Sequence, residues 1–313
     1  MKKSLTCLLL ALFSTLLSAQ GYRSYEELLT EKSLVNTVSF LADDFNTGRA
    51  SGTEGNSRAE QFITSRFRQL GLKPFNWTYT SSFRYKDSIT LRNVAGFVPA
   101  SVPSNEYIIV SAHYDHLGEI KGTIYNGADD NASGVASMLA LAEMYSRMKA
   151  DGRGPLKNII FVAFDGKELN LAGSKHFVKN LPVPAGKVVA DINLDILGTD
   201  LVPTGRNREY IMAIDGGTMP SSCGENLRRI CFRSDYRMDV SLTFYGSEKF
   251  TRMVYRNGDH ASFTKAGIPA VFFTSGFHQH TLKASDDTDI IDFPLLRKRT
   301  LVIFNYINYL FYL

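Results

Sequence analysis

The sequence lacks the short motifs that identify several large enzyme classes. Its glycines spaced four residues apart enclose Ala50 in one case and Ile120 in the other, so no G-x-S-x-G nucleophile elbow is present. It also contains no G-x-G-x-x-G, no H-E-x-x-H and no phosphate-binding P-loop. These absences argue against a serine hydrolase and against a nucleotide-binding enzyme.

Cysteine is also scarce. Of the three cysteines, Cys7 lies in an N-terminal apolar stretch, and only Cys223 and Cys231 remain beyond it. A disulfide between these two is allowed in an oxidising compartment. If SSCGENLRRICF forms one helix, however, the two sulfurs start about 12 Å apart, beyond bridging reach. Free, packed thiols are therefore an equal alternative.

A strong charge bias and linker segments are missing as well. The formal charge is only +4 and the lysines and arginines are scattered, so the chain gives no local support for nucleic-acid binding. No Pro/Ser/Gly-rich linker, low-complexity run or internal repeat divides the 313 residues. We therefore expect residues 21–313 to form one domain, whose oligomeric state the sequence leaves open.

The N-terminal residues have the composition of a processing signal. MKK is a basic start, LTCLLLALFSTLL is an apolar stretch, and LSAQG is a small-residue exit. We predict that residues 1–20 are a signal peptide and that the mature chain is exported to the periplasm or the extracellular space. A spanning helix is the alternative. Because the apolar stretch is shorter than the ~20 residues such a helix needs, we expect no stable membrane insertion.

The rest of the chain alternates between helical and strand-like segments. Helical periodicity covers residues 24–45, 57–72 and 132–148, whereas residues 106–112, 158–164 and 270–274 are short apolar runs rich in Val, Ile and Phe. Such runs are typical of strands buried on both faces. Residues 106–164 read as a βαβ unit, so we predict an α/β fold, a three-layer α/β/α sandwich with a mostly parallel mixed central sheet.

Potential metal ligands follow several of these apolar runs. The segments IIVSAHYDH, NGADDNASG, NIIFVAFDGKE, DINLDILG and HQHT supply His113, Asp129, Glu168, Asp195 and His280. Imidazole and carboxylate groups bind divalent metals, and a bridging carboxylate holds two ions close enough to share a hydroxide. Because strand C-terminal ends form the active sites of parallel sheets, these groups should meet there. We therefore predict a metal-dependent hydrolase.

The stretches HYDHLG, IYNGADDNASGVA and NLDILG resemble the metal-site motifs of a co-catalytic zinc aminopeptidase family, metallopeptidase family twenty-eight, whose relatives include glutaminyl cyclases. The likeness continues through LADDFNTGRASGTEGNSRAEQFITSRFRQLGLKPF and GDHASFTKAGIPAVFFTSG and covers most of the mature chain. It implies a zinc-exopeptidase type of fold, a zinc centre and a peptide substrate. Carried over, His113 and Asp195 would bind one zinc ion, Glu168 and His280 would bind the other, and Asp129 would bridge them.

One position departs from this family. Where the family has two adjacent glutamates, a general base followed by a metal ligand, this chain has Lys167 followed by Glu168. A protonated ammonium cannot accept a proton, so catalysis would need a neutral Lys167 or a base supplied by Asp165. With one metal instead of two, a protonated Lys167 returns the formal charge of the site to zero. The lysine could therefore replace part of a missing metal's charge, which leaves one or two zinc ions open.

Other polar residues are expected around the ligands. We group Asp115 with Lys167 as the catalytic residues, with Asp115 supporting the ligands rather than binding metal. The residues expected to support the ligands or line the cleft are Asp130, Asp165, Asp259, His260 and His278. His278 competes with His280 as the last ligand, and His280 is preferred because His-Thr reproduces the family's local pair. His116 and His176 are expected on the surface or beside the site.

Three functions are consistent with these features. The first, which we expect, is an exopeptidase of the aminopeptidase type, weakened by lysine at the base position. The second is a glutaminyl-cyclase-like acyltransferase, which needs only one metal. The phrase FDGKE resembles the cyclases' version of this loop, whereas HYDHLG favours the peptidases. The third is a non-catalytic binding protein that kept the metal cleft after losing its base.

Overall fold

The computed structural model describes residues 25–86, 88–201, 208–233 and 235–313. The signal peptide predicted over residues 1–20 lies outside these ranges. None of the helices within them is long and apolar enough to cross a membrane.

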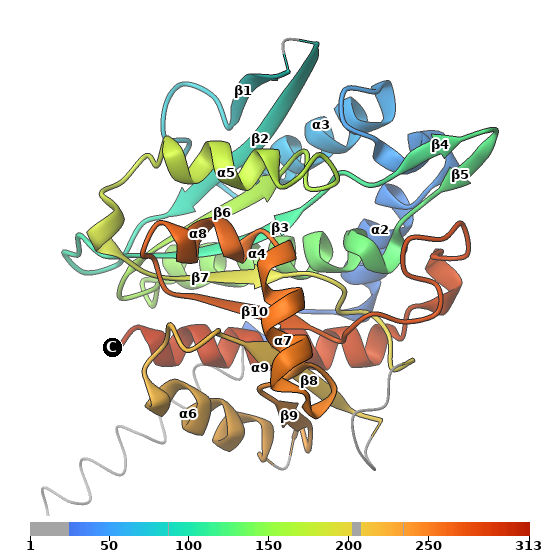
Figure 1. Ribbon diagram of the computed structural model, residues 1–313. Helices are drawn as coiled ribbons and strands as arrows, with labels where there is room; N and C mark the ends of the chain where they lie inside the picture. Colours follow the sequence, from blue (N-terminus) through green and yellow to red (C-terminus); the bar gives the residue numbers. More distant parts are fainter. Residues whose placement is uncertain (1–24, 87, 202–207, 234) are drawn as a thin grey trace, which may run out of the picture.

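Within the described residues, an eight-stranded sheet forms the centre of the protein (Figure 1). Its strands, in spatial order, are β1 (Thr80–Tyr85), β2 (Ile89–Val98), β6 (Asn158–Phe164), β3 (Tyr107–His113), β7 (Val188–Leu194), β10 (Ala270–Thr274), β8 (Tyr210–Ile214) and β9 (Asp239–Ser241). The middle strands β6, β3, β7 and β10 are parallel, whereas β2 and β8 run antiparallel to their neighbours β6 and β10. The sheet is therefore mixed and mostly parallel, as the sequence predicts. A separate hairpin contains β4 (Gly118–Ile120) and β5 (Thr123–Tyr125).

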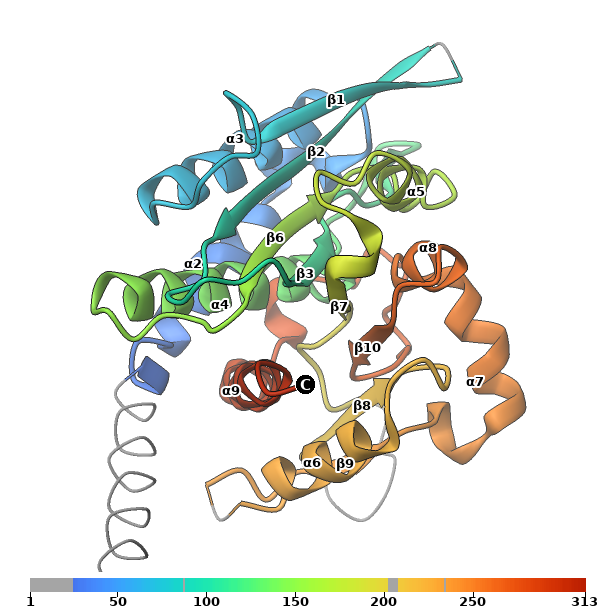
Figure 2. The ribbon, with the colours of Figure 1, turned by 90° about the vertical axis from the view of Figure 1, so that its left-hand side faces the viewer.

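Helices cover both faces of the sheet and complete three layers (Figure 2). One face packs against α2 (Glu31–Leu41), α3 (Glu54–Gln69), α4 (Gly134–Ala150), α6 (Ser221–Cys231) and α9 (Phe293–Leu310). The other face packs against α5 (Ala172–Lys179) and α8 (His260–Lys265), with α7 (Glu248–Val254) near β8. Because successive side chains of a strand point to opposite faces, Ile108 lies in the first core and Ile109 in the second.

The central βαβ unit forms as predicted, whereas the first helix differs. Strands β3 and β6 are parallel neighbours joined through α4. The single helix expected over residues 24–45 is wrong, because two capping side chains interrupt it. Thr30 begins α2 by accepting the N–H of Ser33 (3.1 Å), and Asp43 begins a separate helical turn by accepting the N–H of Phe45 (2.8 Å).

The two cysteines of α6 are free thiols. Cys223 and Cys231 are both buried, and the helix holds them eight residues apart on its core-facing side. The helical geometry therefore decides between the two alternatives that the sequence leaves open.

Arg49 connects segments that lead to the C-terminal edge of the sheet. Its buried guanidinium donates hydrogen bonds to the carbonyl oxygens of Leu41 (2.6 Å), Tyr114 (2.9 Å), Asn126 (2.5 Å) and Gly127 (3.0 Å). Burial lowers the pKa of Arg49 to about 10, so the group stays charged at neutral pH. One side chain thus fixes the residue after β3 and the turn before α4.

We expect Arg49→Lys to destabilise the fold although it keeps the charge. Lysine lacks the planar fork of donors that serves four carbonyls, and buried carbonyls would lose their partners. The expected loss is about 3 kcal/mol or more in the free energy of unfolding, measured by urea denaturation. Arg68→Lys on the exposed side of α3 is the matched control. Equal stability of wild type and Arg49→Lys would contradict this role.

Candidate metal centre

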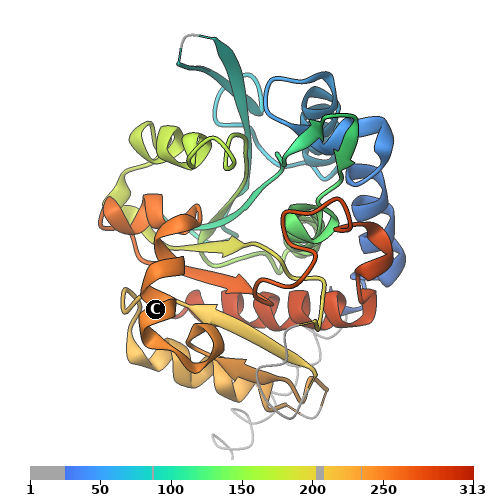
Figure 3. The same ribbon diagram turned by 45° about the vertical axis from the view of Figure 1, so that its right-hand side comes forward.

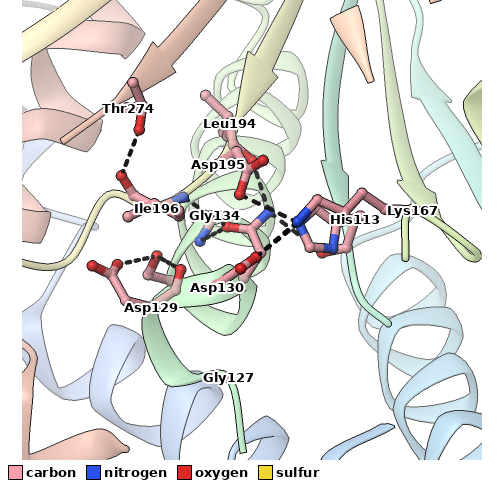
Figure 4. A network of polar contacts seen from close by, with 12 residues as sticks. His113, Gly127, Asp129, Asp130, Gly134, Lys167, Leu194, Asp195, Ile196 and Thr274 are labelled. Atoms are coloured by element: carbon pink, nitrogen blue, oxygen red, sulfur yellow. Dashed lines mark hydrogen bonds and ion pairs between the residues drawn. The ribbon is translucent and has the colours of Figure 1, made fainter. Parts of the chain in front are cut away.

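Three ligand groups meet at the C-terminal edge of the sheet (Figure 4). His113 is the last residue of β3, Asp195 directly follows β7, and Asp130 lies in the turn Ala128–Ser133 before α4. The Nε2 atom of His113 is 3.3 Å from Asp130 Oδ1 and 3.3 Å from Asp195 Oδ1. All three residues are buried. Two buried carboxylates beside an imidazole need a cation, so the site is suited to a metal ion.

The hydrogen bonding of His113 prepares it to bind a metal. Its Nδ1 lies 3.0 Å from the carbonyl oxygen of Asp115, an acceptor that requires the proton on Nδ1. Nε2 then faces Asp130 and Asp195, where a metal ion could replace its proton. Burial and the Lys167 ammonium lower the pKa of His113, but the carboxylates outweigh them and raise it well above its usual value. The site therefore stabilises positive charge, and its nitrogen and oxygen donors fit zinc.

A second group of ligand atoms adjoins the first. It contains His116, Asp130 and Glu168, whose ligand atoms lie within 4.8 Å of one another, as do those of His113, Asp130 and Asp195. We call these the second cluster and the first cluster. Asp130 belongs to both, so it is the carboxylate placed to bridge two cations.

Asp129, which the resemblance assigns as the bridge, has other partners in the structure. Its Oδ1 accepts hydrogen bonds from Ser133 Oγ (2.8 Å) and the N–H of Gly198 (2.6 Å), and its Oδ2 lies 3.1 Å from His278 Nε2. Both oxygens thus hold neighbouring segments together. The adjacent aspartates of this tight turn point in different directions, and Asp130 is the one whose ligand atoms belong to both clusters.

His280, expected to be the last ligand, has other partners in the structure. Its Nδ1 lies 2.9 Å from Ser285 Oγ, its Nε2 lies 3.1 Å from Gln279 Nε2, and among the described residues it joins neither cluster. His278, its competitor, pairs with Asp129 instead. The loop after β10, which contains both histidines, also holds Asp286 against the turn before α4.

His116 is the candidate ligand that the sequence did not identify. Expected on the surface or beside the site, it lies beside the site and is only 1% exposed. Both of its ring nitrogens lack a hydrogen-bond partner among the described residues, and burial lowers the pKa of His116 to about 3. A neutral, unpartnered imidazole next to two carboxylates is suited to metal ligation. The sequence feature that could have identified this ligand is the second histidine of HYDH, three residues after His113.

Lys167 lies between the carboxylates of the second cluster. Its Nζ is 2.8 Å from Glu168 Oε1 and 3.2 Å from Asp130 Oδ1. Burial alone would lower the pKa of Lys167, but Asp130, Asp195 and Glu168 raise it well above its usual value. The lysine is therefore a cation in the metal-free protein.

Asp165, the other base considered, has a structural role. Its Oδ1 accepts hydrogen bonds from Ser51 Oγ (2.6 Å) and Asn56 Nδ2 (3.1 Å), and its Oδ2 accepts from the N–H of Arg92 (3.0 Å). These bonds join three segments of the chain. Asp165 is therefore engaged away from the clusters and does not replace the missing glutamate.

Asp115 positions the metal centre rather than reacting. Its Oδ1 accepts the N–H of Lys167 (3.0 Å) and its Oδ2 accepts the N–H of Glu168 (3.0 Å), while its carbonyl orients His113. Burial raises the pKa of Asp115 to about 7. The same residue thus fixes a ligand of the first cluster and the lysine of the second.

A small pocket of about 150 Å³ opens beside the centre. It is lined by Lys167, Asp195, Val254, Asn257, Gly258, Phe272 and Phe277. His260 supports one wall, because its ring stacks on Phe272 at 4.5 Å between centroids and its Nε2 lies 2.7 Å from the carbonyl of Tyr255. Asp259 is buried, and its Oδ1 has no partner among the described residues.

We expect Asp130→Asn to abolish stabilisation of the protein by zinc, because Asp130 contributes to both clusters. Asp129→Asn is the matched control, which should weaken the metal-free fold and keep the zinc effect. The measurement compares melting temperatures with and without zinc, where a ligand at one hundred times its Kd adds about 2.7 kcal/mol. A zinc-induced shift that persists in Asp130→Asn and disappears in Asp129→Asn would restore the sequence-based assignment.

The buried His260 should make the fold sensitive to acid. Burial lowers its pKa to about 3, so between pH 6.5 and 3 the unfolded chain binds a proton that the native state excludes, and stability falls as pH falls. His260→Phe removes this difference and should reduce the slope of stability against pH by up to about 1.4 kcal/mol per pH unit. Urea denaturation in EDTA from pH 4.5 to 7 measures it; equal slopes would contradict the prediction.

Comparison with known proteins agrees with this geometry. The family model "Peptidase family M28" matches residues 93–307. Aminopeptidase YwaD of Bacillus subtilis is 30% identical over 191 residues, which are 60% of this chain and 36% of that protein. Leupeptin-inactivating enzyme 1 of Streptomyces exfoliatus is 27% identical over 246 residues, 78% of this chain and 48% of that protein. The chain thus spans less than half the length of these curated relatives.

Solved structures share the fold at lower identity. LapB from Legionella pneumophila superposes with a TM-score of 0.72 at 19% identity, covering 92% of this chain and 74% of that one. Glutaminyl cyclase from Porphyromonas gingivalis gives a TM-score of 0.67 at 20% identity, covering 90% of this chain and 99% of that one. These likenesses establish the three-layer fold, and because the family model matches more than half of the sequence, the chain belongs to peptidase family M28.

Proposed function

We propose that this protein is a zinc-dependent exopeptidase of the aminopeptidase type, which removes N-terminal residues from peptides with an activity weakened by Lys167. The observation that carries the proposal is the first cluster, in which an oriented histidine and two buried carboxylates lie beside a pocket. The names of the relatives, an aminopeptidase and a leupeptin-inactivating enzyme, support the same class of reaction.

The centre provides the groups that peptide hydrolysis needs. His113, Asp130 and Asp195 would hold the zinc ion, which when bound polarises a carbonyl and makes water more acidic. Asp115 keeps the histidine in the tautomer that binds metal. The pocket wall formed by Val254, Phe272 and Phe277 would exclude water and accept a small apolar side chain of the substrate.

The centre has no free proton acceptor at the position where the family has its general base. Lys167 takes the position where the family has its general base, and Glu168, the neighbouring carboxylate, is paired with its ammonium at 2.8 Å. General bases contribute typically 10²- to 10⁴-fold to a rate. The wild-type protein should therefore turn over peptides slowly.

A glutaminyl-cyclase-like acyltransferase is the second candidate. It is favoured by the phrase FDGKE, which resembles the cyclases' version of this loop, and it is consistent with the fold shared with Porphyromonas gingivalis glutaminyl cyclase. This reaction needs only one metal ion and consumes no water, so a lysine at the base position could harm it less.

We also propose that the protein acts outside the cytoplasm, in the periplasm or the extracellular space. The proposal rests on the basic and apolar residues at the start of the sequence. N-terminal sequencing of the protein recovered from each cell fraction tests it.

The decisive experiment compares wild type, Lys167→Glu and Lys167→Met, each supplied with zinc. With aminoacyl-anilide substrates we expect Lys167→Glu to raise turnover by ~100-fold or more, because it restores a general base, and Lys167→Met to give no such rise. N-terminal glutaminyl peptides are assayed in parallel. Cyclisation without anilide hydrolysis would favour the acyltransferase, and no turnover by any variant would indicate a binding protein.

A further inference from the structure

The second cluster contains a cation position that is already filled by a side chain. The ammonium of Lys167 lies 2.8 Å from Glu168 Oε1 and 3.2 Å from Asp130 Oδ1. These two carboxylates, with His116, form the second cluster. The lysine side chain is only 15% exposed, so solvent screens its charge weakly.

His116 is an independent sign that this position is suited to a metal. Its two ring nitrogens lie buried without any hydrogen-bond partner among the described residues. Buried polar atoms are nearly always paired, so an unpaired imidazole beside two carboxylates needs an explanation. A lone pair available for a metal ion provides one, because neutral imidazole is a common metal ligand.

Charge balance decides which cation occupies the position. Asp130, Glu168 and Asp195 carry three negative charges, which one divalent ion and one ammonium neutralise together. Two divalent ions in addition to the ammonium would leave a net positive charge in a buried site, which is costly. The backbone N–H of Lys167 donates a hydrogen bond to Asp115 Oδ1 (3.0 Å). This bond fixes the backbone from which the lysine side chain reaches the two carboxylates.

We propose that the protein holds a single zinc ion in the first cluster, and that the Lys167 ammonium occupies a second metal position whose ligands are His116, Asp130 and Glu168. This inference rests on the proposed metal centre and not on catalysis. It assigns His116 as a latent ligand, which binds metal only when the lysine is removed.

The experiment is a count of zinc per chain by elemental analysis after dialysis against zinc and then against metal-free buffer. Wild type should retain about one ion, and Lys167→Ala should retain about two. The double variant Lys167→Ala, His116→Ala should return to one. Lys175→Ala, which removes an exposed lysine of α5, is the matched control and should stay at one.

Two outcomes would overturn the inference. Two tightly held zinc ions in wild type would show that the ammonium does not exclude the second metal. A single ion in both Lys167→Ala and Lys167→Met would show that no latent site exists. The Met variant is included because its side chain fills similar space to lysine, so it serves as the test if the Ala substitution disturbs the fold. A protein that binds one zinc and hydrolyses nothing would refute the exopeptidase and leave this inference intact.

Discussion

The carboxylate of Asp130 is the group on which the whole centre depends. It is 1% exposed and lies 3.3 Å from His113 Nε2 and 3.2 Å from Lys167 Nζ, so it links both clusters. Although burial alone would raise it, the nearby Lys167 and His113 hold the pKa of Asp130 well below its usual range. A charge buried this deeply is stable only with positive partners in contact. Either a bound metal ion or the Lys167 ammonium can therefore supply the positive charge that the buried Asp130 carboxylate needs.

Distant parts of the chain hold Asp130 in place. The carboxylate of Asp286 accepts the N–H groups of Asp129 (2.8 Å) and Asp130 (3.0 Å), which brings the loop after β10 against the start of α4 (Figure 3). The side chain of Asn131 donates to the carbonyl of Leu194 at the end of β7 (2.8 Å). The turn is thus fixed from both sides only when the sheet is complete. The ligand geometry is a property of the folded domain rather than of the local motif.

This dependence explains what the sequence could and could not predict. The apolar runs of β3, β6 and β10 predict buried strands, and their order predicts the parallel centre, because periodicity is a local signal. His113, Asp195 and Glu168 follow from strand ends for the same reason. The choice between Asp129 and Asp130 depends on the direction of two adjacent side chains in a tight turn, which periodicity does not encode. The position of His280 is set by a long loop that no local pattern describes, and His116 was not identified because its environment comes from the turn before α4.

Lys167 shows how one residue changes both the chemistry and the metal content of a site. A glutamate there would add a negative charge and accept a proton, and the extra charge would favour a second divalent ion. The lysine does the reverse in each respect, since its ammonium bonds to Asp130 and Glu168 and gives no acceptor. Base function and second-metal binding therefore both depend on this residue, because glutamate favours both and lysine opposes both. Within this fold, the residue before Glu168 selects between a two-metal centre with a base and a one-metal centre with a fixed internal cation.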